Sequence, residues 1–68
     1  MTIDWFRILA DLERAGVSNA KVAAILGREE STVYRWKMGS EPRFSDGAAL
    51  LALHVRHVDI AELQAAST

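Results

Sequence analysis

Glycines divide the first 39 residues into short segments in which apolar side chains recur at every third or fourth position. These glycines are Gly16, Gly27 and Gly39. The spacing is typical of amphipathic helices, and glycine often follows a helix because it readily adopts positive φ. The alternation of β-branched and polar residues that marks strands is absent from the sequence. The chain is therefore predicted to be all-α.

The sequence predicts a compact domain of five helices. Thr2, Ser18 and Ser45 are favourable N-caps, and Asp59 with Glu62 has the spacing of a capping box. A glycine follows each of the first three predicted helices. The expected helices span residues 2–15, 18–26, 29–38 and 45–55, with a last short helix from residue 59.

The loop before the fourth predicted helix, residues 40–44, contains the only proline of the chain, Pro42. Phe44, at the end of this loop, is expected to enter the core. In the preceding helix, Val33 and Trp36 share the face that is expected to point inward. We interpret the Trp36 indole as part of the core rather than as a ligand contact.

Size and composition favour a small intracellular protein. Sixty-eight residues suffice for one domain, over residues 1–68. A core this small rarely supplies more than about 3–5 kcal/mol, so a second subunit is expected to add stability. The chain has no cysteine and no apolar run near the roughly 18 residues of a membrane span. We therefore expect a cytoplasmic protein that does not contact a membrane.

The segment 48–65 is more apolar than one buried helical face requires. Part of it is expected to remain exposed on a monomer and to be covered by a second copy. The alternative is that the last two predicted helices only complete the core. The predicted homodimer contacts are Leu53, Val55, Val58, Ile60 and Leu63.

The net charge of −1 hides an uneven distribution. From Lys21 to Arg43 the chain has five positive and three negative residues, a local charge of +2, and the remainder carries −3. A nucleic-acid-binding domain is usually more basic than this chain as a whole. The central segment is the region in which such a function is expected.

Residues 17–39 have the pattern of two short helices that cross in contact. The small side chain of Ala23 permits a close approach, and Gly27 permits a tight turn between the helices. In the second helix Val33 and Trp36 anchor one face. The opposite, free stripe would fit the major groove of B-DNA, and consists of Glu30, Ser31, Tyr34, Arg35 and Met38.

This segment resembles, without a gap, the helix-turn-helix of the Cro/repressor family of bacterial and phage transcription regulators. The resemblance is carried by Ser18, Ala23, Leu26-Gly27, Ser31-Thr32-Val33 and Gly39. It implies a lambda-repressor-like domain whose third helix reads DNA. Arg28 and Glu29 depart from the family pattern, which usually has an apolar residue and then a serine N-cap there.

The resemblance and the side-chain chemistry together indicate DNA contacts. Arg35 is the candidate for a bidentate contact to guanine, and Glu30 for accepting from cytosine N4. The predicted base contacts are Glu30, Ser31, Tyr34 and Arg35. The predicted phosphate contacts are Asn19, Lys21, Arg28, Lys37, Met38 and Arg43. The alternative is that Arg35 and Lys37 only pair with Glu30 and Glu41 on a solvated face.

Catalysis finds no support, because the chain has no cysteine nucleophile, no phosphate-binding glycine-rich loop and no plausible Ser-His-acid set. His54 and His57 lie three residues apart but have no third ligand within a recognisable motif. No enzyme activity, metal, cofactor or small-molecule ligand is expected.

The sequence therefore predicts a sequence-specific regulator that binds double-stranded DNA. We expect a small, nucleoid-associated Cro-like repressor that binds a palindromic operator as a homodimer. Because no effector domain is present, we expect it to repress by covering promoter DNA. The alternative is a helix-turn-helix fold reused as a protein-interaction module, an inhibitor or adaptor with little DNA affinity. Such a module would present Glu29 and Glu30 to a basic partner.

Overall fold

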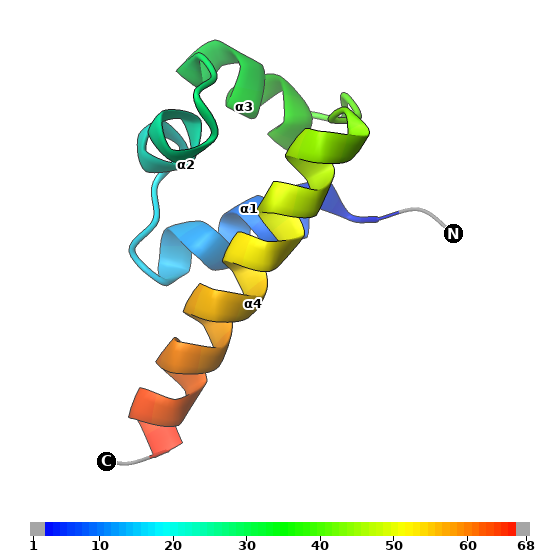
Figure 1. The fold of residues 1–68 in the computed structure, drawn as a ribbon. Coiled ribbons are helices and arrows are strands. Elements are labelled where there is room, and N and C mark those ends of the chain that lie inside the picture. Colours follow the sequence, from blue (N-terminus) through cyan, green and yellow to red (C-terminus); the bar gives the residue numbers. More distant parts are fainter. Residues whose placement is uncertain (1–2, 67–68) are drawn as a thin grey trace.

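A computed structural model describes the backbone of residues 3–66 and the side chains of residues 3–58. Over this range the chain forms four helices and no strand (Figure 1). They are α1 (Trp5–Arg14), α2 (Asn19–Leu26), α3 (Glu30–Lys37) and α4 (Phe44–Ala66). The prediction of an all-α fold is confirmed. The prediction of five helices is wrong, because the chain has four.

The predicted boundary between the fourth and fifth helices is absent, because α4 continues through both of them. The predicted break rested on the capping-box spacing of Asp59 and Glu62. A capping side chain satisfies N–H groups that a break has already exposed, but it does not cause the break. No glycine or proline interrupts residues 48–66. The backbone hydrogen bonds of the helix therefore continue through this segment.

Local side-chain chemistry fixes the ends of the first two helices. Ser18 caps α2, as predicted, because its Oγ accepts a hydrogen bond from the Lys21 backbone N–H at 3.3 Å. Gly27 ends α2 with a φ of 69°, also as predicted. α1 begins after Asp4, whose Oδ1 accepts from the Arg7 backbone N–H at 3.1 Å. The predicted cap, Thr2, lies outside the described residues.

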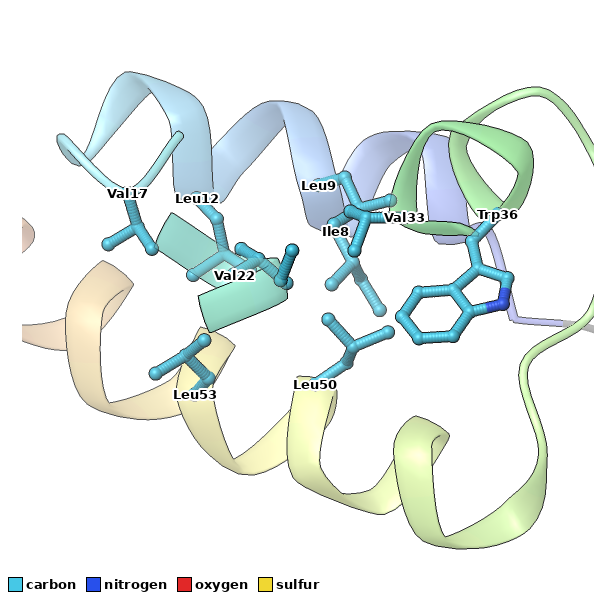
Figure 2. Packing of buried hydrophobic residues seen from close by; sticks show 10 residues of the cluster. Ile8, Leu9, Leu12, Val17, Val22, Val33, Trp36, Leu50 and Leu53 are labelled. Atoms are coloured by element: carbon cyan, nitrogen blue, oxygen red, sulfur yellow. The ribbon is translucent and has the colours of Figure 1, made fainter. Parts of the chain in front are cut away.

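The core lies where the first three helices meet α4 (Figure 2). Each helix contributes at least one fully buried side chain, and these are Leu9, Leu12, Val22, Val33 and Leu50. Trp36 is 6% exposed, which confirms the prediction that it packs inward with Val33. Because no helix buries its apolar face alone, each of the four depends on the others for its stability.

Phe44 does not enter the core, contrary to prediction. Its residue is 91% exposed, whereas Asp46 is only 7% exposed. Each helical residue turns by about 100°, so a side chain two positions before an inward one points roughly to the opposite side. The loop begins α4 in a register that directs Asp46, and not Phe44, toward the rest of the molecule.

A side-chain hydrogen bond joins α1 to α4. His54 Nε2 lies 3.0 Å from Asp11 Oδ2, and Arg14 also pairs with the Asp11 carboxylate. The hydrogen bond from His54 and, next, that from Arg14 hold the pKa of Asp11 below its ordinary value of 3.8. His54, which is not expected to bind a metal, therefore has a structural partner in Asp11.

The lowered pKa of Asp11 predicts a specific loss of stability in acid. A carboxyl whose pKa is lower in the folded chain stabilises that chain above its unfolded pKa, here 3.8. The contribution is lost as the pH falls through the lower, folded pKa. Asp11→Asn should therefore flatten the fall in the free energy of unfolding below pH 3.8, measured by urea titrations at several pH values. His54→Gln should flatten it in part, and equal slopes in all three proteins would contradict the prediction.

Candidate nucleic-acid interface

α2 and α3 are joined by a turn of three residues, Gly27 to Glu29. The Gly27 N–H donates to the carbonyls of Ala23 and Ala24, and the Arg28 N–H donates to the Ala23 carbonyl at 2.8 Å. These bonds end α2 and turn the chain sharply. Ala23 is 4% exposed, so the crossing is filled by a small side chain, as the motif requires. The arrangement is a helix-turn-helix.

α3 has two distinct faces. Val33 and Trp36 are buried against the other helices. On the other face, Tyr34 is 55% exposed, and Met38, just after the helix, is 65% exposed. The free stripe predicted from the sequence is exposed throughout, at Glu30, Ser31, Tyr34, Arg35 and Met38. All four predicted base contacts therefore lie on one accessible surface. These four residues and Met38 form what we call the α3 stripe.

Lys37, a predicted phosphate contact, is held against α1. Its Nζ lies 3.1 Å from Glu13 Oε2 and 5.7 Å from the centroid of the Phe6 ring. Only 21% of the Lys37 side chain is exposed. The ion pair and the cation–π contact brace α3 against α1. Lys37 is thus less available to a phosphate than its position in the sequence indicated.

Arg28, another predicted phosphate contact, binds the start of α4. Its Nε donates to both carboxylate oxygens of Asp46, at 3.1 and 3.2 Å. The Asp46 side chain is 10% exposed, so this cation neutralises a largely buried carboxylate. Arg28 fastens the turn of the helix-turn-helix to α4. Its departure from the Cro/repressor pattern therefore has a structural use.

Three of the other predicted phosphate contacts, Asn19, Lys21 and Arg43, are exposed or partly exposed. Lys21 and Arg43 are exposed. Asn19 is partly buried, and its Oδ1 is buried without a hydrogen-bond partner among the described residues. Because a phosphate accepts hydrogen bonds, only the Asn19 amide Nδ2 would serve in such a contact. Glu29 and Glu30 are exposed at the start of α3, so the surface carries charges of both signs.

The model of the homeodomain-like domain family matches residues 3–38, from just before α1 to the end of α3. The chain belongs to this family. The match includes the whole helix-turn-helix and supports a DNA-binding function for it. It does not extend to the Cro/repressor type in particular, so that resemblance holds only at the level of the helix-turn-helix. No match was found among curated proteins or among solved structures.

The described part of this homeodomain-like domain contains no helix long and apolar enough to cross a membrane. Nor do three or more His, Cys, Asp or Glu side chains gather around a possible metal position in that part. The predicted dimer contacts differ in their surroundings. Leu53 is 8% exposed and belongs to the core, whereas Val55 is 57% exposed. The side chains of Ile60 and Leu63 lie outside the described residues.

Sequence reasoning missed the partners of Arg28 and Lys37. Asp46 follows Arg28 by 18 residues, and Glu13 precedes Lys37 by 24. The sequence did indicate a place for Asp46, because an acidic residue is favourable in the first turn of a helix, where it complements the helix dipole. This preference places Asp46 at the start of a helix, but it does not place it beside Arg28 in the turn between α2 and α3.

The Arg28–Asp46 pair predicts that Arg28 matters for folding. Arg28→Ala would leave the Asp46 carboxylate largely buried without its cation, which costs about 1–3 kcal/mol. We expect a loss of that size in the free energy of unfolding, measured by urea denaturation. Arg43→Ala, at an exposed arginine before α4, is the matched control and should cost less than about 0.5 kcal/mol. Equal effects of the two substitutions would contradict the structural role of Arg28.

Proposed function

We propose that this homeodomain-like domain is a sequence-specific transcription regulator, a small repressor that covers its operator. The observation that carries the proposal is the α3 stripe, which is exposed over its full length while Val33 and Trp36 hold the opposite face of the helix. A helix presented in this way fits the major groove of B-DNA.

The side chains of the α3 stripe suit base recognition. Arg35 is exposed and makes no ion pair in the part of the chain that the structure describes, so its guanidinium is available to guanine O6 and N7. Glu30 can accept from cytosine N4, and Tyr34 can contact a thymine methyl group. Lys21, Arg43 and the Asn19 amide would contact phosphates, which position the domain without reading sequence.

The proposed repressor acts as a homodimer on a palindromic operator, in the manner of Cro-like regulators. Two copies of α3 about 34 Å apart would enter successive major grooves on one face of the duplex. Occupation of promoter DNA is the proposed means of repression, and no catalysis is part of it. The exposed Val55 on α4 supports a second copy as the partner.

The test is a selection of bound sequences from random duplex DNA at about physiological salt, where non-specific contacts are weakened. We expect an enriched inverted repeat whose half-site spacing gives the distance between the two copies of α3. The variant in which Arg35 is replaced by alanine provides the control, because it should enrich a site relaxed at one base pair in each half. A well-folded protein that enriches no sequence would overturn the proposal.

A second candidate function is a protein-interaction module. Glu29 and Glu30 are exposed at the start of α3, and two predicted phosphate contacts, Arg28 and Lys37, are ion-paired within the chain. Such a surface would suit a basic partner and would bind all DNA sequences weakly. Charge reversal separates the two functions, because Glu29→Lys should raise affinity for DNA phosphates but abolish binding to a basic protein.

A further inference from the structure

α4 carries a second apolar stripe in addition to the one that enters the core. Phe44, Ala48, Leu51, Val55 and Val58 follow one another at intervals of four, three, four and three residues. This is the spacing of the a and d positions of a coiled coil. The stripe extends about 21 Å along the helix, and we call it the α4 seam.

The α4 seam faces away from the core of its own chain. Nine residues separate Phe44 from Leu53, which places the two side chains about half a turn apart around the helix. Leu53 is buried, whereas Phe44 is 91%, Val55 57% and Leu51 37% exposed. Ala48 is also exposed, and Val58 is partly exposed. The seam is thus an apolar surface that is open at Phe44 and Val55 and partly covered by its own chain at Leu51 and Val58.

The shape of the molecule leaves this surface open. α1, α2 and α3 lie beside the N-terminal half of α4, and the last turns of α4 extend past them (Figure 1). A shallow, mostly apolar hollow of about 180 Å³ adjoins the first half of the seam. Ile3, Trp5 and Pro42 line it beside Phe44 and Leu51, and Arg43 at its edge is its one charged residue. The apolar surface is therefore broader at that end than the helix alone.

The charge pattern favours a second copy of this chain as the occupant. A surface that contacts itself across a two-fold axis must face its own charges, and like charges there would repel. The seam and the positions that flank it between residues 44 and 58 contain no Lys, Arg, Asp or Glu, and the flanking residues are Ser45, Gly47, Ala52 and His54. The small side chains of Ser45 and Ala52, both exposed, also permit two helices to approach closely on that side of the seam. A helix with the same four-three spacing is what fills such a seam, and α4 itself is that helix.

We propose that the α4 seam is the surface through which two copies of this chain associate, with Leu51 near the two-fold axis. Leu51 is the middle residue of the seam. The proposal deepens the homodimer of the proposed function and rests on it. It replaces Leu53, which is buried in the core, by Leu51 as the central contact, and it retains Val55 and Val58.

Sedimentation velocity of the full chain without DNA tests the seam. Measurements over roughly a hundredfold range of concentration are needed, because dimer population depends on protomer concentration. We expect the parent to dimerise and Leu51→Glu to raise the dissociation constant at least about tenfold, since each glutamate would face its own copy. Ala49→Glu, at an exposed position of α4 away from the seam, is the matched control and should dimerise like the parent. A monomeric parent, or a Leu51→Glu variant that dimerises as well as the parent, would overturn the proposal.

A cross-linking experiment keeps the test decisive if Leu51→Glu does not fold. The chain has no cysteine, so a single introduced thiol reports one contact. Leu51→Cys should form a disulfide-linked dimer on mild oxidation, and Ala49→Cys should not. The reverse pattern would overturn the seam.

Failure of the proposed function can be told apart from failure of the seam. A dimer that forms through the seam but selects no DNA sequence refutes only the repressor. A selected site with a single half would refute the homodimer while leaving DNA recognition intact.

Discussion

Replacing Leu50 with alanine is expected to leave a large part of the chain unfolded at 25 °C. Leu50 is fully buried and points from α4 toward side chains of α1 and α3 (Figure 2). Truncation of a buried leucine to alanine costs about 2–5 kcal/mol, because transfer energy is lost and a cavity remains. A core of this size supplies about 3–5 kcal/mol in total, so one such substitution removes most of it.

The measurement is the free energy of unfolding from urea titrations, at a protein concentration where the parent and its variant have the same oligomeric state. Ile25→Ala is the matched control, since it removes the same number of carbon atoms from a side chain that is 59% exposed on α2. It should cost less than about 1 kcal/mol. A Leu50→Ala variant as stable as Ile25→Ala would show that the described core is not the one that holds the fold.

Arg35→Ala is expected to change which DNA sequences are bound more than how tightly DNA is bound in general. A bidentate arginine–guanine contact discriminates against other bases by about 1–3 kcal/mol, which corresponds to roughly 5-fold to 150-fold in affinity. The loss should be confined to one base pair of each half-site. It is measured by competition binding against a set of single-base variants of the selected site.

Lys21→Ala is the contrasting variant for this experiment, because Lys21 is exposed and is a predicted phosphate contact. It should weaken all sequences alike and reduce the slope of log affinity against log salt by about one. If Arg35→Ala also weakened every site equally, Arg35 would be a phosphate contact and the assignment of the α3 stripe to the major groove would be wrong.

The sequence predicted both ends of α2 well because local chemistry sets them. Ser18 caps α2 with its own hydroxyl, and Gly27 ends it in a conformation that glycine adopts readily. The two faces of α3 were also predictable, since Val33 and Trp36 are three residues apart on one helix. Each of these features depends on residues close together in the sequence.

The predictions that failed concern α4 and its surroundings. The break before Asp59 was inferred from a capping pattern, yet nothing in residues 48–66 interrupts the helix. Phe44 is expected in the core from its place at the end of the loop, but the register of α4 turns it outward. The register of α4 depends on how the preceding loop packs against the other helices, and neither composition nor spacing specifies this packing.

The candidate site was predictable in its residue types and not in its pairings. Arg35 and the other members of the α3 stripe lie where the helical pattern placed them. Arg28 and Lys37 are predicted phosphate contacts, and both have acidic partners on helices distant in sequence. A long cation can reach several acceptors, so its partner is decided by the packing of the helices rather than by its own position.

The separation of the two faces of α3 affects how the recognition specificity of this chain could evolve. In the described part, no side chain of the α3 stripe makes a hydrogen bond or an ion pair with another residue, and Val33 and Trp36 hold the helix from behind. Substitutions on the stripe would therefore leave the free energy of unfolding nearly unchanged, within about 0.5 kcal/mol. New recognition preferences could accumulate one residue at a time without compensating changes in the core, so a lineage built on this scaffold is free to diversify its targets.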